Sequence, residues 1–143
     1  MFKKIIWATD GSDSADRALE YAKAFVTEGG ATLIAVHSIE TLGGPGSRGA
    51  FPADLDEDAH QAKIKKQIEE FGEKATFRLV MGGVSSAAHA LADVAKEENA
   101  DLIVVGTRGH TALGGLLLGS VTQRLLHIAP CPVLAVPQTA ASS

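Results

Sequence analysis

The sequence lacks the features that several protein classes require. It holds one cysteine, Cys131, in 143 residues, so no disulfide can form within the chain and a reducing cytoplasm is the expected compartment. A net charge of −4, without a basic stripe, argues against a nucleic-acid partner. The apolar run from Ile5 to Ala8 is too short for a signal peptide, and nothing approaches the roughly 20 apolar residues of a membrane span. These absences predict a soluble, cytoplasmic protein.

The common catalytic and phosphate-binding motifs are also missing. No G-x-x-x-x-G-K-[ST] occurs, which excludes a Walker A loop. The one G-x-G-x-x-G, from Gly44 to Gly49, falls in a stretch predicted to be irregular rather than directly between a strand and a helix, so it is no Rossmann fingerprint. No Ser-His-Asp pattern is visible, and the Gly11-Ser12 pair lacks the G-x-S-x-G elbow. His60, His89 and His127 have no second histidine or pair of cysteines at metal-ligand spacing, so we predict no zinc site.

For two residues with reactive side chains, the sequence context favours a structural role. Cys131 lies between Pro130 and Pro132 without an activating neighbour, which favours a small buried hydrophobe over a reactive thiol. His37 ends an apolar run, where a hydrogen-bonded core histidine is more common than a ligand. Neither residue is therefore assigned to a site.

What the sequence does contain is a regular alternation of strand-like and helix-like segments. A nearly unbroken apolar run, as in residues 32–38, is typical of a strand buried on both faces of a parallel sheet. Arg78 suggests that its strand lies at an edge. Residues 40–54, with four glycines and two prolines, are predicted to be irregular. The expected strands are residues 5–8, 32–38, 76–81, 102–105 and 133–136. The first expected helix has its cap at Asp13 or Ser14 and ends at Gly29-Gly30, and the second covers about 56–71 with Gly72 as its stop. The third follows a Gly82-Gly83 turn and has its cap at Ser85 or Ser86, and the fourth ends at about Ile128.

This alternation predicts an α/β fold: one domain, residues 1–143, with a five-stranded parallel sheet between two layers of helices. Strand order cannot be derived from spacing. The flavodoxin-like five-strand order is the natural prior, and it would place a ligand crevice beside the carboxyl end of the first strand.

The residues at the carboxyl ends of three strands suggest a nucleotide site. Glycines allow close approach of a phosphate, and a helix start offers unpaired N–H donors. The Ser38–Ile39 backbone could pair with a base edge, and Asp10 could accept a hydroxyl or a water of bound Mg²⁺. The candidate nucleotide-binding residues are Thr9, Asp10, Ser38, Gly106, Arg108, Gly109, Gly119, Ser120, Val121 and Thr122.

Each candidate has a purely structural alternative. Gly106 and Gly109 can be turn residues, Ser120 a helix cap, and Asp10 the acceptor of an Asx turn. Arg108 and the neighbouring His110 can be solvated surface residues. These alternatives stay open on the sequence alone.

One spaced motif nevertheless resembles a known family. Gly106, Gly109, Gly119 and Ser120 fit the pattern G-x2-G-x9-G-[S/T], followed by Val121 and Thr122 and later by Pro-Cys-Pro-Val-Leu-Ala-Val. The pattern is similar to the ATP-binding members of the universal stress protein family, and the resemblance extends over essentially the whole chain. It covers Ile-Trp-Ala-Thr-Asp-Gly-Ser near the start and Asp-Leu-Ile-Val-Val-Gly-Thr-Arg-Gly in the second half.

The resemblance implies a sheet of order 3-2-1-4-5, as in adenine nucleotide alpha hydrolase-like folds, and a homodimer paired through residues 133–136. It also implies that the positions of Thr9, Asp10, Ser38, Gly106, Gly109, Gly119, Ser120 and Val121 contact ATP. Two positions depart from the family pattern. Ser38 stands where valine is common, and the segment from Gly82 to Ser85 lacks the usual proline.

The functional prediction is an adenine-nucleotide-binding regulatory or sensing dimer of the stress response, taking ATP, AMP or ADP with Mg²⁺. Two alternatives remain: a dimeric interaction module that needs no nucleotide, and an enzyme that hydrolyses ATP slowly. Fast phosphoryl transfer would need strong charge stabilisation and a positioned acceptor. Asp10 and His110 are the local candidates, and no catalytic residue is assigned.

Overall fold

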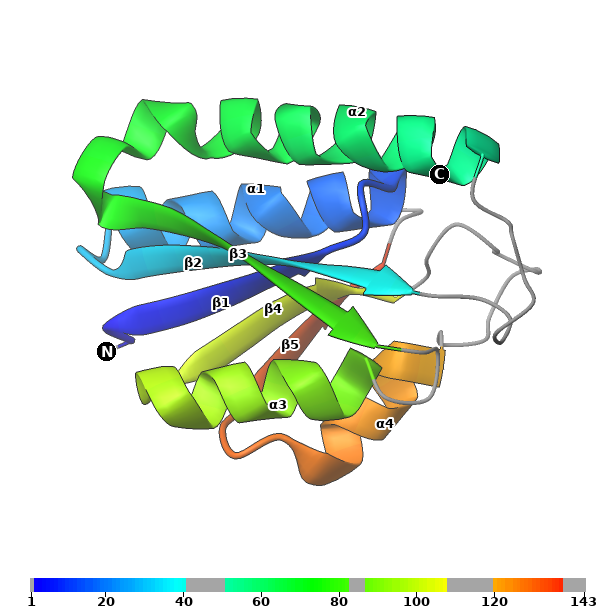
Figure 1. The fold of residues 1–143 in the computed structure, drawn as a ribbon. Helices are drawn as coiled ribbons and strands as arrows, with labels where there is room; N and C mark the ends of the chain where they lie inside the picture. The colour runs from blue at the N-terminus through cyan, green and yellow to red at the C-terminus, as the bar shows by residue number, and fades with distance from the viewer. Residues whose placement is uncertain (1, 41–50, 83–86, 108–119, 138–143) are drawn as a thin grey trace.

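A computed structural model describes residues 2–40, 51–82, 87–107 and 120–137, and these form one parallel sheet with helices on both faces (Figure 1). The strands and helices are β1 (Lys4–Thr9), α1 (Asp13–Thr27), β2 (Thr32–Glu40), α2 (Phe51–Ile68), the 3₁₀ helix η1 (Glu69–Lys74), β3 (Ala75–Gly82), α3 (Ala87–Glu98), β4 (Leu102–Gly106), α4 (Ser120–Ile128) and β5 (Val133–Val136).

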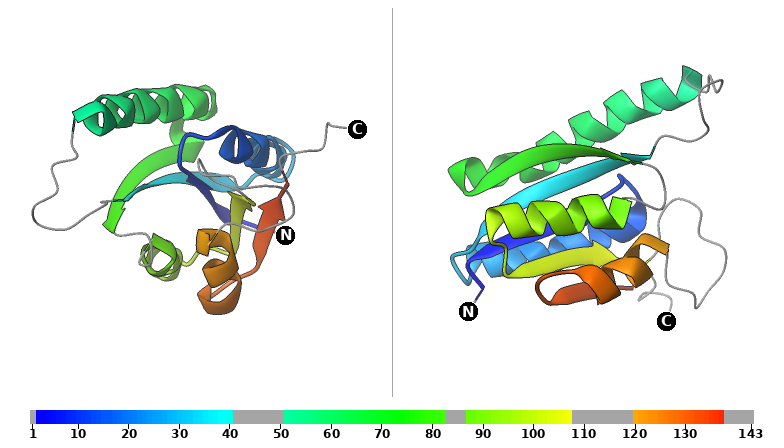
Figure 2. Two further views of the ribbon diagram at one scale, coloured as in Figure 1. Left: turned by 90° about the vertical axis from the view of Figure 1, so that its right-hand side faces the viewer. Right: turned by 60° about the horizontal axis from the view of Figure 1, so that its bottom comes forward.

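The sheet has the order β3-β2-β1-β4-β5, and each pair of neighbouring strands is parallel. Helices α1 and α2 cover one face and α3 and α4 the other, as the end-on view in Figure 2 shows. The predicted α/β sandwich with order 3-2-1-4-5 is confirmed. The edge position inferred for the strand of Arg78 is confirmed as well.

Alternating side chains of β1 divide the core into two halves. Ile5 and Trp7 pack with α1 and α2, whereas Ile6 and Ala8 pack with α3 and α4. All four are buried, which is why the strand is an apolar run rather than an alternation of polar and apolar residues. The indole N–H of Trp7 donates to the Ala15 carbonyl at 2.9 Å and so ties the first turn of α1 to β1.

The structure corrects the predicted cap of the first helix. The N-cap is Ser12, whose backbone is extended and whose hydroxyl accepts the Ala15 N–H at 3.3 Å. Asp13 and Ser14 were predicted as caps, but both already lie inside α1. An N-cap must keep a non-helical backbone, and the turn before α1 gives that conformation to Ser12.

Helix α2 is longer at its start than predicted. It begins at Phe51, inside the stretch 40–54 that was predicted to be irregular, because Pro52 falls in the first turn, where a backbone N–H has no helical partner. It ends at Ile68 rather than Phe71, and Gly72, the predicted stop, has φ 58° within η1.

Two strand ends also differ from the prediction. β2 continues past Ser38 to Glu40, and Gly82, predicted as a turn residue, is the last residue of β3 because it pairs with Glu40 across the sheet. The predicted caps Ser85 and Ser86, and residues 41–50, lie outside the described residues.

Candidate functional site

The carboxyl ends of β2, β1 and β4 lie side by side and form what we call the carboxyl edge of the sheet. Thr9 is level with His37 of β2, and Ala8 with Val105 of β4. The chain moves outward from β1 to β2 and β3, then crosses to the other side of β1 to form β4 and β5. The strand order therefore reverses between β1 and β4, and parallel α/β sheets bind ligands at such a point. Of the segments predicted to hold a nucleotide, the described parts at Thr9–Asp10, Ser38 and Gly106 meet there.

The loop between β1 and α1 is shaped by its own side chains. The Thr9 hydroxyl accepts the Gly11 N–H at 3.0 Å, and Asp10 Oδ1 accepts the Ser12 N–H at 2.9 Å. Gly11 has φ +84°, a conformation that side chains disfavour. Thr9 is buried and Asp10 half-buried. The Asx turn, a structural alternative for Asp10, is thus present, and the same turn fixes the direction of its carboxylate.

His37 supports this loop from β2. It is buried, and its Nδ1 lies 2.9 Å from the Thr9 carbonyl oxygen. A carbonyl oxygen can only accept, so Nδ1 is the protonated ring nitrogen in this contact. The prediction that His37 is a hydrogen-bonded core histidine is confirmed.

Gly106 ends β4 and lies directly against the start of α1. A Cβ at this position would lie 2.7 Å from the Ser14 carbonyl oxygen and 2.8 Å from its carbon, closer than real Cβ atoms approach backbone. The packing of β4 on α1 therefore requires glycine here, whatever binds nearby.

The first turn of α4 is held to the same strand end. The buried Thr122 hydroxyl donates to the Gly106 carbonyl oxygen at 2.8 Å. This bond holds the first turn of α4 at the carboxyl edge. The first N–H groups of a helix have no partner within the helix. It also commits the hydroxyl proton of Thr122 to the fold rather than to a phosphate.

The predicted site residues fall into three groups. Thr9, Asp10, Ser38 and Gly106 stand at the carboxyl edge, and Val121 and Thr122 lie in the first turn of α4. Ser120 is described only as the first residue of α4. Arg108, Gly109 and Gly119, together with His110, lie outside the described residues.

Sequence reasoning missed the contribution of α2 to this edge. The His60 ring packs on Gly11, since a Cβ there would lie 2.8 Å from His60 Cδ2. Lys63 Nζ donates to the Gly11 carbonyl at 3.1 Å. The available signal was weak: His60, Lys63 and Gln67 recur at i, i+3 and i+7, which puts polar residues on one helix face. Nothing in that spacing identifies the loop they contact.

Neither a metal cluster nor an activated thiol accompanies this edge within the described ranges. No three histidine, cysteine, aspartate or glutamate side chains gather there in a way that could hold a metal ion. Cys131 packs against the α3–α4 side of the core, where burial and then the negative charge of Asp101 raise its pKa. A raised pKa leaves less thiolate, which agrees with the prediction against a reactive thiol, but Cys131 is half-buried rather than buried as predicted.

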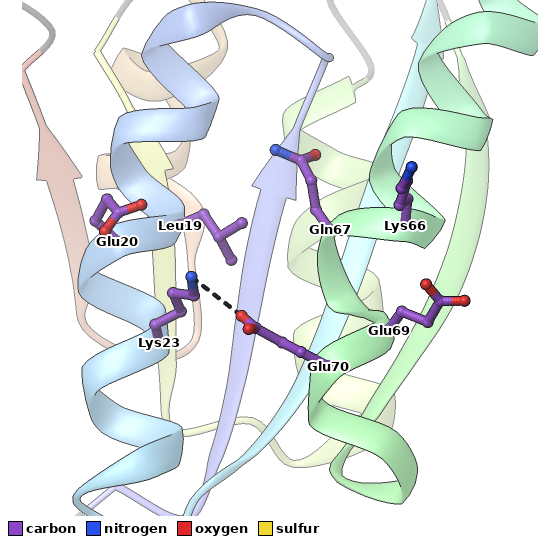
Figure 3. A pocket seen from close by; sticks show the side chains of 7 residues that line it. All are labelled: Leu19, Glu20, Lys23, Lys66, Gln67, Glu69 and Glu70. Atoms are coloured by element: carbon purple, nitrogen blue, oxygen red, sulfur yellow. Dashed lines mark ion pairs between the residues drawn. The ribbon is translucent and has the colours of Figure 1, made fainter.

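A groove of about 450 Å³ lies elsewhere, between α1 and the end of α2 (Figure 3). Lys23 and Glu70 form an ion pair of 3.0 Å across it. Its lining is Leu19, Glu20, Lys23, Lys66, Gln67, Glu69 and Glu70. Because the lining mixes both charges and runs along the helices, the groove offers no complement to a nucleotide, and we place the site at the carboxyl edge.

None of the helices in the described segments is long and apolar enough to cross a membrane.

Comparison with known proteins agrees with the fold. The model of the universal stress protein family matches residues 1–137. A universal stress protein of Thermus aquaticus, encoded in a sulfhydrylase 3′ region, is 38% identical, and the match covers 95% of this chain and 99% of the relative. The solved structure of MJ0577 from Methanocaldococcus jannaschii superposes with a TM-score of 0.71 at 30% identity, covering 96% of each chain.

A further solved structure is a universal stress protein in complex with cAMP. It is 29% identical with a TM-score of 0.67, and the match covers 94% of this chain and 97% of that one. The family match over nearly the whole length, together with the shared strand order, settles the classification. This chain belongs to the universal stress protein family.

Proposed function

We propose that this protein binds adenine nucleotides at its carboxyl edge and acts in the cytoplasm as a nucleotide-dependent regulator or sensor of the stress response. The observation that carries the proposal is the Thr122–Gly106 hydrogen bond of 2.8 Å. It brings the N-terminus of α4 to the end of β4, beside β1, where the strand order reverses. A helix N-terminus is a favourable place for phosphate because its N–H groups and dipole both attract anions.

The nucleoside end of the ligand fits the other side of the crevice. The pairing of β1 with β2 ends at Thr9 and His37, while β2 continues to Glu40. The backbone at Ser38 and Ile39 therefore runs past the end of β1, where the proposal places the base edge. The cAMP complex of a 29%-identical family member supports an adenine nucleotide as the ligand class.

Magnesium fits the proposal through Asp10. Mg²⁺ keeps several waters and is commonly held by one or two carboxylates plus substrate phosphates. The Asp10 carboxylate is half-buried and oriented by the Ser12 N–H, so it can accept a water of such an ion. Lacking a Walker lysine, the site would rely on backbone dipoles and the metal to offset phosphate charge.

Calorimetric titration with Mg-ATP, ADP, AMP and cAMP tests the proposal. We expect a micromolar site for at least ATP, lost in the Gly109→Ala, Gly119→Ala double variant. Gly30→Ala, at the opposite end of the sheet, is the matched glycine control and should bind as the unmodified protein does. Absence of binding by the unmodified protein would overturn the proposal. Many turnovers of released phosphate per second would show an enzyme instead.

The proposal includes a homodimer through β5. β5 is an edge strand of the sheet order, and an unpaired edge strand is a template for pairing with a second copy. Its residues Val133, Leu134 and Ala135 are half-buried in this chain. Native mass spectrometry would report the dimer and any co-purified nucleotide together, and a monomer at micromolar concentration would refute this part.

A further inference from the structure

One face of α2 is fastened to the start of α1 and to the loop before it. Lys63 Nζ pairs with the Asp16 carboxylate at 2.8 Å and donates to the Gly11 carbonyl at 3.1 Å. Gln67 Nε2 donates to the other oxygen of Asp16 at 3.0 Å. His60 packs its ring against Gly11. Lys63 thus joins residues about fifty positions apart in the sequence, and the loop it reaches carries Asp10.

A second contact to the same loop comes from β2. His37 Nδ1 contacts the Thr9 carbonyl at 2.9 Å, and the His37 and His60 rings meet edge to face with centroids 6.2 Å apart. The backbone from Thr9 to Gly11 is therefore contacted by both β2 and α2. Its conformation depends on both.

Planarity of the peptide bond gives the Lys63 contact a specific consequence. The Gly11 carbonyl and the Ser12 N–H belong to one peptide unit, which rotates as a rigid plane. Lys63 binds the carbonyl end of that plane, and Asp10 Oδ1 accepts from the N–H end at 2.9 Å. Fixing the carbonyl therefore fixes the direction from which the N–H meets the Asp10 carboxylate.

We propose that Lys63 is a positioning residue of the nucleotide site, acting through the Gly11–Ser12 peptide on the orientation of Asp10. This inference rests on the proposed function and deepens it, because nucleotide affinity then depends on how α2 packs against the loop between β1 and α1. Lys63 would not contact the ligand itself. Its role would be to fix the orientation of the Gly11–Ser12 peptide plane.

The exposure of the ion pair separates this role from a general stabilising one. The side chains of Lys63 and Asp16 are 38% and 33% exposed, and half-exposed pairs contribute little to the free energy of unfolding. Gly11 adds the freedom that makes external support necessary, because glycine tolerates many backbone conformations. Loss of Lys63 should then alter the loop more than the stability of the whole fold.

The first arm of the test measures Mg-ATP affinity by calorimetry. Lys63→Met keeps the aliphatic stem and removes the donor, and we expect the Kd to rise about five-fold, the size of one lost hydrogen bond. Lys63→Arg can still donate to both the carbonyl and the carboxylate, and should return the Kd to within about two-fold of the original. Lys66→Met, one turn along the exposed side of α2, is the matched control and should leave the Kd unchanged.

The second arm observes the loop without nucleotide. In ¹H–¹⁵N spectra, Lys63→Met should shift the amide signals of Gly11 and Ser12 and speed their hydrogen exchange, whereas Lys66→Met should not. Lys63→Arg should restore both signals. A purely structural role would change the urea midpoint of unfolding without a selective change at these two amides.

The outcomes separate this inference from the proposed function. Equal Mg-ATP affinity in the unmodified protein and Lys63→Met, with unchanged Gly11 and Ser12 amides, would overturn the positioning role and leave nucleotide binding standing. No binding by the unmodified protein would overturn both. A weaker Kd that Lys63→Arg does not rescue would also count against positioning, because the guanidinium reaches the same two acceptors.

Discussion

The two ends of the sheet use acidic side chains in opposite ways. At the amino ends of the strands, Asp101 accepts the Lys4 N–H at 2.9 Å and the Lys3 N–H at 3.0 Å, joining segments 97 and 98 residues apart. At the carboxyl ends, Asp10 accepts an N–H only two residues away. The amino end is closed by long-range bonds that hold β1 against β4. At the carboxyl end the acidic side chain shapes a local turn, and long-range contacts to this loop come from His37 and Lys63, so its conformation depends on what packs against it.

Glycines follow the same division. Gly106, at the carboxyl edge, is required because the backbone of α1 lies in contact with it. Gly30, at the other end of the sheet, has φ +75°, and a Cβ added there would meet no atom within 4 Å. The first glycine is needed for space and the second for backbone conformation. Replacing each by alanine therefore measures two different physical costs.

The largest effect is expected from Gly106→Ala. The added carbon would overlap the Ser14 backbone, which cannot move aside as a flexible side chain can, so the free energy of unfolding should fall by about 3 kcal/mol. Gly30→Ala meets only the strain of a positive φ and should cost about 1 kcal/mol. Urea unfolding of both variants measures the difference. An equal loss of unfolding free energy in the two variants would contradict the distinction between a glycine needed for space and one needed for backbone conformation.

The fold was predictable from the sequence because each strand is a short apolar run bounded by turn residues. Leu102 to Val105 and Thr32 to Ser38 were placed correctly within one or two residues. Their order in the sheet came from family resemblance, since alternation alone fits several orders. The helix end at Gly29-Gly30 followed from the preference of glycine for positive φ, which Gly30 adopts.

The site was predictable only where neighbours in the sequence determine it. The turn at Asp10 and the helix start at Ser120 follow from local residue types. The requirement for glycine at position 106, both for packing against α1 and for the crevice, does not follow from local residue types, because Ser14 lies far away in the sequence. The contact of Lys63 with Gly11 depends on how α2 lies across the sheet, and helical spacing does not specify that.

The next largest effect is expected at the amino ends of the strands. Asp101→Asn should lower the free energy of unfolding at neutral pH by about 1 kcal/mol, because an amide accepts more weakly than a carboxylate. Desolvation acts to raise the pKa of Asp101, but the N–H donors of Lys4 and Lys3 outweigh it and hold the pKa below 3.8. The stabilisation is therefore complete above pH 3.8 and is lost as the pH falls through the lower folded value.

Acid titration of stability checks this sign. The unmodified protein should lose more stability below pH 3.8 than Asp101→Asn does, so the two curves should converge at low pH. Asp93→Asn, an exposed aspartate of α3, is the control and should keep the wild-type acid response. Parallel curves for the unmodified protein and Asp101→Asn would show that Asp101 is not the anchor of the amino end.

The smallest effect is expected between the two ends, at the Lys23–Glu70 pair. Its side chains are 37% and 54% exposed, so water and salt screen the attraction, and Lys23→Met should change the free energy of unfolding by about 0.3 kcal/mol or less.

The hydrogen bond to Glu70 raises the pKa of Lys23, against the lowering effect of burial. The contribution is therefore present below pH 10.5 and lost as the pH rises through the raised value. Urea unfolding at pH 7, at low salt and in about 1 M salt, measures it. A loss as large as that of Asp101→Asn would mean that the helix layer, rather than the amino end of the sheet, carries the long-range electrostatic anchoring of this fold.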